Sequence, residues 1–373
     1  MVQMIVQIKA GAFYQNKLGV SSACLKMLKE GTSHLSSEKI AEQLDYIGSY
    51  LVCNKGKDFV SLHIYFQPKA TKQVMILLAD LLKQPLFPQE QLAIYKQNLK
   101  NELAVDLEKT SYIARSRFMK SVFGEHRYGQ SLTLNDIEFI SRNDLLDFFQ
   151  QYYHAGNIKI FAAGQIDTGF VDELEKYFGN IVRKTNVELP QTNCFPKAIK
   201  QYEEKQDAVQ SSLYIGKRCV NKNHQDWCLF SLISLILGGY FGSRLMRNIR
   251  EDKGLAYHIY SELHSFLHDG VFYVAADVNK SKVKKAIEEI YAEMNDLKIK
   301  IMPKEELNLV KNYLYGTLMK CFDGVFQQLD LLLVMENYNL PLDFWTNYVD
   351  NIQKLQEADI LDGANKMLDI ENM

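Results

Sequence analysis

The sequence has few of the features that mark a disulfide-rich or zinc-ribbon protein. Its 373 residues include only 6 cysteines, which lie far apart, and no two of them form a C-x-x-C pair. This spacing argues against a zinc ribbon and against a disulfide scaffold. We therefore expect free and mostly buried thiols.

Excess charge and long apolar runs are also missing. The 43 Lys and Arg residues nearly balance 45 Asp and Glu residues, so a net charge of −2 gives no general attraction to nucleic acid. The longest apolar run, from Trp227 to Leu237, contains two serines and is shorter than the roughly 18 to 20 residues of a membrane helix. The first residues lack the basic and apolar regions of a secretory leader. We expect a cytoplasmic protein with no membrane span and no nucleic-acid partner; a leader missing from this N-terminus stays an alternative.

The length and composition indicate two globular domains. The chain is long enough for about two domains, and 47% hydrophobic and 24% charged residues are ordinary for a globular protein. A segment with two prolines, many charges and few apolar residues separates two richer regions. We predict an N-terminal half over 1–182, a linker over 183–207 and a C-terminal half over 208–373. A long surface loop in place of the linker is the alternative.

Hydrophobic periodicity predicts alternating strands and helices. We expect strands over 2–9, 59–67 and 158–164, and helices over 18–29, 71–84 and 168–178, with further helices starting near 36, 88 and 141. One arrangement recurs. The segment FVSLHIYFQPKATKQVMILLADLL leads into PLFPQEQLAIYKQNLKNEL, and GVFYVAADVNKSKVKKAIEEIYAEM leads into IMPKEELNLVKNYLYGTL. Each copy reads as a strand, a short polar turn, an amphipathic helix and a second helix begun near a proline. The repeat predicts an α+β protein with two homologous halves, each a mostly antiparallel sheet covered by helices on one face.

The common catalytic motifs are absent. The sequence has no G-x-S-x-G elbow, no Walker loop and no G-x-G-x-x-G after a strand. His264 and His268 are four residues apart, but they lie on a predicted strand that leads into a turn. Without helical geometry this spacing does not bring two imidazoles together on a metal.

Two segments carry a family resemblance. The first is LGVSSACLKMLKEGTSHLSSEKIAEQLDYIGSYL, with the later LLADLLKQPLFPQEQLAIYKQNLKNEL and GEHRYG. The second is LILGGYFGSRLMRNIREDKGLAYHIYSEL. Together they resemble the pitrilysin, or insulinase-like, family of inverted zinc metallopeptidases, over nearly the whole chain. The resemblance implies a pitrilysin-like duplicated fold.

The resemblance also implies where a zinc motif would stand. The family has H-x-x-E-H on a helix just before the GT pair, and here Ser22 and Lys26 take the histidine positions while Leu25 takes the glutamate position. A hydroxyl is a poor zinc ligand, an ammonium has no lone pair to donate, and an aliphatic chain accepts no proton. Glu102 fits the spacing of the third ligand, but a lone carboxylate does not hold zinc. We expect a chain without a metal or cofactor of its own.

The second segment keeps a pair that the resemblance marks as functional. Family members carry an Arg and a Tyr seven residues apart in the C-terminal half, facing the zinc site, and Arg250 and Tyr257 match them within RNIREDKGLAY. Gly254 permits a turn between them. Arg offers a fork of donors for a peptide carbonyl, and Tyr offers a hydroxyl donor for charge that develops on it. The alternative without a functional role is a solvated Arg and a half-buried Tyr on a strand.

Three functional hypotheses follow. The first is a non-catalytic, zinc-free subunit of a heterodimeric metallopeptidase, which is inactive alone and forms half of a peptide-binding clamshell with a zinc-bearing partner. The second is a structural or peptide-binding scaffold without a role in proteolysis, similar to the respiratory-chain core subunits, in which case a homodimer is possible. The third, an independent peptidase with other ligands, is disfavoured because no other His/Glu cluster has ligand spacing.

Overall fold

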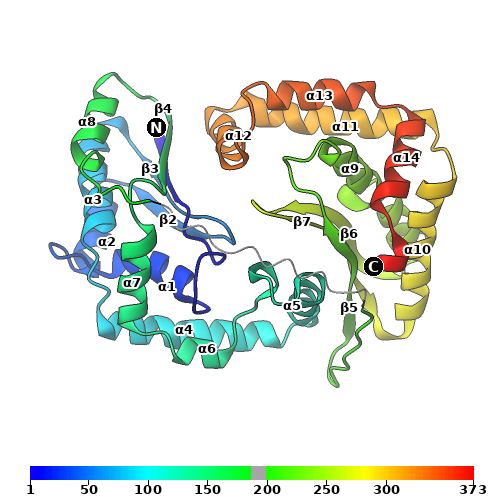
Figure 1. Ribbon diagram of the computed structural model, residues 1–373, viewed down its shortest axis with the longest axis horizontal. Coiled ribbons are helices and arrows are strands. Elements are labelled where there is room, and N and C mark those ends of the chain that lie inside the picture. The colour runs from blue at the N-terminus through cyan, green and yellow to red at the C-terminus, as the bar shows by residue number, and fades with distance from the viewer. Residues whose placement is uncertain (186–198) are drawn as a thin grey trace. The chain divides into compact units, whose positions relative to one another are not determined.

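A computed structural model describes residues 1–185 and 199–373, and their contacts divide them into two compact units (Figure 1). Among the described residues, the first unit holds 1–105, 130–185 and 324–330, and the second holds 106–129, 199–323 and 331–373. Residues 186–198 of the expected linker lie outside the described part, and the linear domain boundaries stay a prediction. Each unit therefore includes one short stretch from the other's part of the sequence: residues 106–129 belong to the second unit, and residues 324–330 belong to the first.

The first unit is built on a four-stranded antiparallel sheet in the order β2-β3-β1-β4. Strand β1 (Val2–Ile8) pairs on one side with β3 (Val60–Phe66) and on the other with β4 (Ile158–Gly164), and β2 (Tyr50–Lys55) forms an edge. All seven residues of β1 are buried, as expected for an apolar strand with a neighbour on each side.

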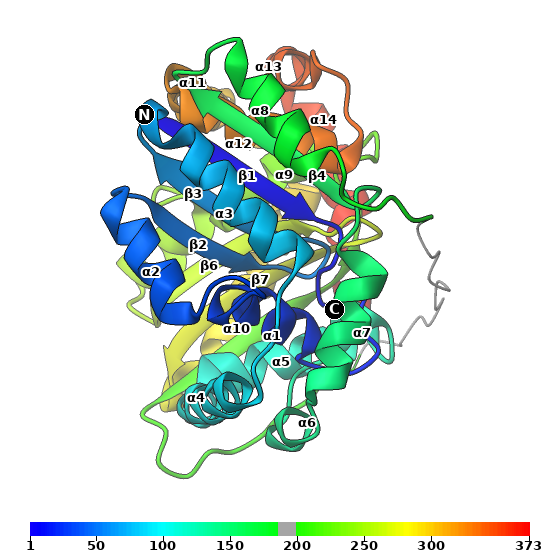
Figure 2. The ribbon, with the colours of Figure 1, turned by 90° about the vertical axis from the view of Figure 1, so that its left-hand side faces the viewer.

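Helices pack on the first sheet and around it. Figure 2 shows α3 and α8 over one face of the sheet. Ser141 caps α7 with a reciprocal pair of bonds to Asp144, as the sequence predicts. The helices of this unit are α1 (Val20–Met27), α2 (Ser37–Tyr46), α3 (Thr71–Lys83), α4 (Gln89–Leu107), α6 (Leu134–Glu138), α7 (Arg142–Tyr152) and α8 (Gly169–Phe178).

The second unit repeats the strand order of the first. Its antiparallel sheet runs β5-β7-β6, with β5 (Gln210–Cys219), β6 (Ala256–Ser265) and β7 (Gly270–Asn279). The order β2-β3-β1 of the first sheet therefore corresponds to β6-β7-β5 here. Strand β7, helix α10 and helix α11 match β3, α3 and α4, which is the repeat that the sequence predicts.

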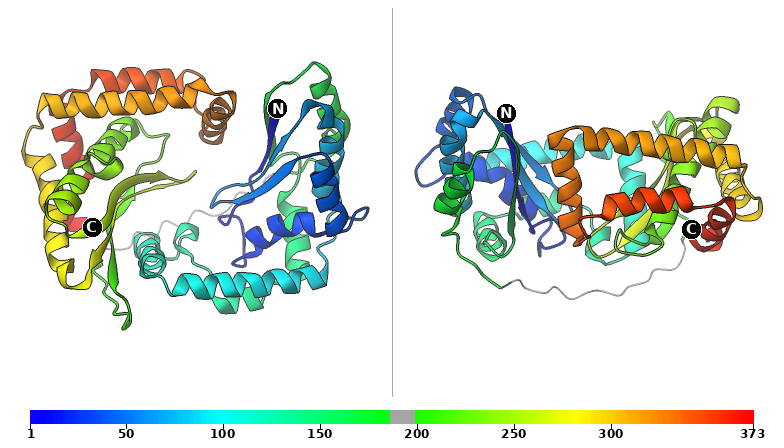
Figure 3. Two further views of the ribbon diagram at one scale, coloured as in Figure 1. Left: turned by 180° about the vertical axis from the view of Figure 1, so that it is seen from behind. Right: turned by 90° about the horizontal axis from the view of Figure 1, so that it is seen from above.

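Helices α9, α10 and α14 lie on one side of the second sheet (Figure 3), where an apolar cluster forms the core. Helix α5 lies against the other face, and the Phe118 ring packs 5.6 Å from that of Tyr214 and 5.7 Å from that of Tyr273. The helices are α5 (Thr110–Phe123), α9 (Trp227–Ser234), α10 (Val283–Ile299), α11 (Lys304–Asp323), α13 (Phe344–Lys354) and α14 (Glu357–Met367), while α12 (Val325–Tyr338) begins in the first unit and ends in the second.

The architecture confirms the predicted fold class of two antiparallel sheets in α+β halves. In the described residues, no helix combines the length and the apolar content that a bilayer crossing requires. Helix α5 and strands β2 and β5 are elements that the sequence analysis did not predict.

Candidate functional site

The zinc-motif positions lie on α1 in the first unit. This helix follows Gly19, whose φ of 88° gives the sharp entry into its first turn. Buried Ala23, Cys24 and Met27 fix one side of the helix in the core. Leu25 is also fully buried, so the position of the family's general base is part of the hydrophobic core. The side chain at this position can neither activate water nor contact it.

Ser22 is engaged by neighbouring polar groups. Its hydroxyl donates to the carbonyl of Gly19 at 3.1 Å and lies 3.3 Å from the Tyr95 Oη on α4. A serine hydroxyl has one hydrogen, so with this hydrogen on Gly19 the phenol donates to Ser22. Burial raises the pKa of Tyr95, and the Glu102 carboxylate acts in the same direction. The phenol therefore stays protonated and keeps its donor.

Glu102 lies on α4 seven residues after Tyr95, two helical turns along the same face. It is exposed, as expected for a solvated helix residue. Lys26 on α1 is half-buried near β2. Burial raises the pKa of the Cys53 thiol on β2, and the positive charges of Lys26 and Lys29 act in the opposite direction.

These side chains do not fit a zinc ion. Ser22 is hydrogen-bonded, Leu25 is aliphatic and Lys26 is a cation, which leaves Glu102 alone among the four positions. Over the described ranges, no group of three or more His, Cys, Asp or Glu side chains is placed to hold a metal. The structure places three of the predicted positions on α1 and Glu102 on α4, and the contact that it shows between these helices here is that of Ser22 with Tyr95.

Arg250 lies on the π-helical segment Met246–Asp252 of the second unit. Its side chain is 38% exposed. Its Nε lies 3.7 Å from the neighbouring Glu251 carboxylate, and its guanidinium carbon lies 5.8 Å from the centroid of the exposed Phe241 ring. Such a long, exposed ion pair holds an arginine weakly, so the donors of Arg250 remain available to a ligand.

Tyr257 occupies a β-bulge at the start of β6. Ala256 pairs with Val278 and His258 pairs with Asp277, so Tyr257 is an extra residue that has no paired residue on β7. As a result, two successive side chains, Tyr257 and His258, are exposed, where regular alternation would bury one. Tyr257 is 59% exposed, and within the described chain its hydroxyl has no hydrogen-bond partner. The bulge therefore aims a free phenol at solvent.

The turn between these two residues is fixed to α10. Gly254 adopts a φ of +55°, and its carbonyl accepts a 2.9 Å bond from the Lys282 ammonium. Asn248 donates to Glu293 at 2.6 Å, and Lys253 forms an ion pair with Glu289. These contacts give the segment that carries Arg250 and Tyr257 a defined geometry.

A polar cluster on the same sheet escaped the sequence analysis. Tyr273 on β7 donates to the Glu262 carboxylate on β6, and His264 Nδ1 lies 3.0 Å from that carboxylate. The hydrogen bond from His264 lowers the pKa of Glu262, while burial raises that of Tyr273. The sequence pattern that could have revealed this cluster is the alternation along β6, which places on one face His258, Tyr260, Glu262 and His264.

Two family descriptions match the chain. "Insulinase (Peptidase family M16)" matches residues 1–135, and "Peptidase M16 inactive domain" matches residues 140–314. An uncharacterized zinc protease, YmxG, from Bacillus subtilis is 25% identical over 306 residues, which are 81% of this chain and 74% of that protein. A non-peptidase homolog, also YmxG, from Helicobacter pylori is 24% identical over 375 residues, covering 96% of this chain and 84% of that one.

Solved structures share the fold. A peptidase M16 inactive domain from Pseudomonas fluorescens superposes with a TM-score of 0.88 at 22% identity, covering all of this chain and 91% of the other. A protease from Helicobacter pylori gives 0.89 at 18% identity, with coverages of 100% and 92%. The matches span both units. The chain therefore belongs to the M16, or insulinase, family of peptidases.

Proposed function

We propose that this protein is the zinc-free subunit of a heterodimeric M16 metallopeptidase. It supplies Arg250 and Tyr257 to the zinc site of a partner subunit and forms half of the chamber that binds the substrate peptide. Alone it hydrolyses nothing and needs no metal or cofactor. Its substrates are peptides or unfolded polypeptide segments.

The observation that carries this proposal is the contrast between the two candidate sites. The zinc positions are occupied by a buried leucine, a cation and a hydrogen-bonded serine, whereas Arg250 and Tyr257 keep exposed donors on an anchored turn. A residue pair with only a structural role has no need of a bulge that exposes one of its members. Bulges are frequent next to active sites, where they redirect a side chain.

The chemistry of the pair suits a partner's hydrolytic centre. The planar guanidinium of Arg250 presents parallel N–H donors to a substrate carbonyl and so orients the peptide. The Tyr257 hydroxyl donates to the oxygen of the scissile carbonyl as negative charge develops there. Removal of one such donor typically costs about 10²- to 10³-fold in kcat.

The test is peptide cleavage by the reconstituted pair. The chain is mixed with a zinc-motif subunit encoded next to it, and kcat and KM are measured for wild type, R250A and Y257F. We expect Y257F to lower kcat by roughly 10²-fold. Matched controls are R247A, on the same π-helical segment, and Y315F, on α11, both exposed and both expected to leave cleavage unchanged.

Two outcomes contradict the proposal. If R250A and Y257F cleave like wild type, the protein does not contribute to the partner's reaction, and the scaffold hypothesis takes its place. If the purified chain alone binds zinc stoichiometrically by elemental analysis and cleaves peptide, it is not a zinc-free subunit.

A further inference from the structure

Lys222, in the segment between β5 and α9, places its amine against two aromatic rings of the second unit. Its Nζ lies 4.4 Å from the ring centroid of Trp227 at the start of α9, and 5.8 Å from that of Tyr338 at the end of α12. Trp227 is buried in the core, and the Tyr338 hydroxyl donates to the Ser265 carbonyl at 2.8 Å. Lys222 itself is half-buried, so its side chain keeps a path to solvent.

The backbone beside Lys222 is fixed by a turn and by hydrogen bonds to a neighbouring loop. The side-chain amide of Asn221 donates to the carbonyls of Phe266 at 3.3 Å and Leu267 at 3.0 Å. The backbone carbonyl of Asn221 accepts from the N–H of His224 at 3.1 Å. The segment is therefore anchored to the turn between β6 and β7, and the position of the amine is a feature of the folded unit.

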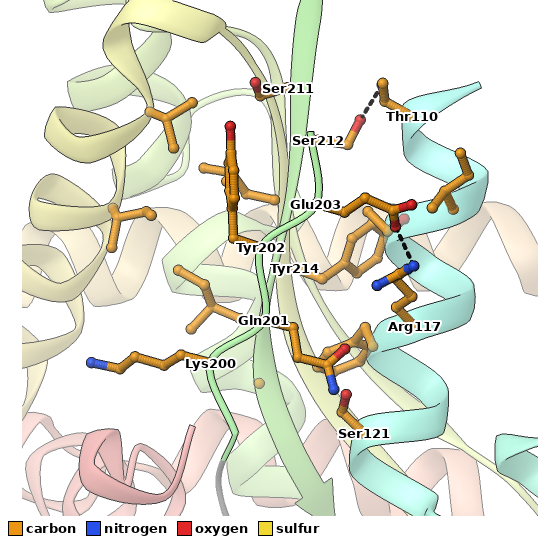
Figure 4. Close-up of a pocket in the computed structure, with 18 of the residues that line it drawn as sticks. Thr110, Arg117, Ser121, Lys200, Gln201, Tyr202, Glu203, Ser211, Ser212 and Tyr214 are labelled. Carbon is orange, nitrogen blue, oxygen red and sulfur yellow. Dashed lines mark hydrogen bonds and ion pairs between the residues drawn. The ribbon is translucent and has the colours of Figure 1, made fainter. Parts of the chain in front are cut away.

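The amine lacks the acidic partners that other basic groups of this unit have. Figure 4 shows a pocket beside β5 in which Arg117 forms an ion pair with Glu203. Lys280 likewise pairs with Glu204, at 2.6 Å. Over residues 1–185 and 199–373, Lys222 has neither a salt bridge nor a hydrogen bond to a protein acceptor. Its contacts are the two aromatic faces.

The chemistry of the amine differs from that of other lysines that are partly removed from water. Burial alone lowers the pKa of Lys222 to about 8. Burial also lowers the pKa of Lys83 and of Lys311, but these amines donate to the carbonyls of Tyr177 and Gln353, which favours their charged form. At pH 7.5 roughly a quarter of the Lys222 amine is neutral, against about a thousandth of an ordinary lysine. A desolvated lysine of this kind is a nucleophile.

We propose that the Lys222 amine is a site of acylation by acyl phosphates. The neutral Nζ attacks the carbonyl carbon and a C–N bond forms. The C–O bond to phosphate then breaks, inorganic phosphate leaves, and the nitrogen loses one proton to solvent. The product is a neutral amide beside Trp227 and Tyr338, so no charge has to be held away from water against the two rings. The site is separate from Arg250 and Tyr257 and needs no zinc-bearing partner, so it stands or fails independently of the proposed function.

The experiment is a time course of the full chain with acetyl phosphate at pH 7.5, followed by peptide mass spectrometry. Acetylation of Lys222 is compared with that of Lys311 and of Lys366, an exposed lysine on α14. We expect Lys222 to react about tenfold faster than either, because its larger neutral fraction outweighs its lower intrinsic nucleophilicity. In concentrated guanidinium chloride the three are expected to react at equal rates. Equal rates in the folded protein, or a faster Lys311, overturn the proposal.

Variants connect the reactivity to the aromatic contacts. Y338A removes one ring and admits water, so it is expected to slow the acetylation of Lys222 several-fold. Y338F keeps the ring, and Y315A removes an exposed tyrosine of α11; both are expected to react like wild type. The chain has two tryptophans, so W345F leaves Trp227 as the single fluorophore, and its emission is expected to change as Lys222 is acetylated. The proposal is overturned by an unchanged emission, which also decides the question if Y338A does not fold, or by a folded Y338A that reacts like wild type.

Discussion

The hydroxyl of Ser22 on α1 lies 3.3 Å from the Oη of Tyr95 on α4, at a position where the family resemblance predicts a zinc ligand. Glu102 lies two turns along α4 from that tyrosine. A contact between two hydroxyls therefore connects the two helices at this point. Gly19 and Tyr95 both hydrogen-bond to the partly buried Ser22 hydroxyl, so this side chain keeps no unpaired donor.

A glutamate at position 25, which the zinc motif requires, is expected to destabilise the folded protein. Leu25 is fully buried, so L25A is expected to lower the free energy of unfolding by about 2 to 5 kcal/mol. L25E is expected to cost more, because it also buries a carboxylate. Urea denaturation measures both, with S22A as a control that costs about 1 kcal/mol. An L25E variant as stable as wild type would show that this position opens to solvent.

Gly254 is expected to link stability to function at the Arg250–Tyr257 turn. G254A places a β-carbon at a φ of +55° in open space, so its cost of about 1 to 2 kcal/mol is conformational. Gly48 has a φ of +60° and equally open surroundings in the first unit, which makes G48A a matched control. Both variants are expected to melt at similarly lower temperatures, but only G254A is expected to lower peptide cleavage by the reconstituted heterodimer. Equal cleavage by both variants would argue against the geometric role of this turn.

His154 is expected to make the first unit sensitive to acid. The residue is 2% exposed, and its Nδ1 accepts backbone N–H groups of Gly156 at 3.2 Å and Lys184 at 3.4 Å. Burial lowers the pKa of this imidazole, and the Lys184 charge adds to the effect. As pH falls below the unfolded pKa of about 6.5, the unfolded chain takes up a proton that the folded chain does not, and stability is lost.

The measurement is the melting temperature at pH 7.5 and pH 5.5. H154N keeps an acceptor for the backbone N–H groups but does not titrate, so its melting temperature is expected to fall less than that of wild type over this interval. The same fall in both proteins would assign the acid sensitivity to other groups.

Some elements could be predicted from sequence because their signals are local. The Ser141–Asp144 capping box forms as expected, and β4 has the bounds that the periodicity predicts. Helix α5 was missed because only Phe118 and Phe123 are buried in its fourteen residues, which gives no clear apolar stripe. Strand β5 was missed because it has only half-buried residues, so its pattern lacks the contrast of a core strand.

The sequence by itself determined the family and the duplicated α+β fold, because these depend on which residue types occur and in what order. Only the tertiary structure decided that Tyr257 lies in a bulge, that Ser22 contacts Tyr95, and that Tyr273 and His264 meet at the Glu262 carboxylate. Each of these depends on how segments distant in sequence pair and pack, and pairing across strands and helices leaves no signal in the spacing of a single chain.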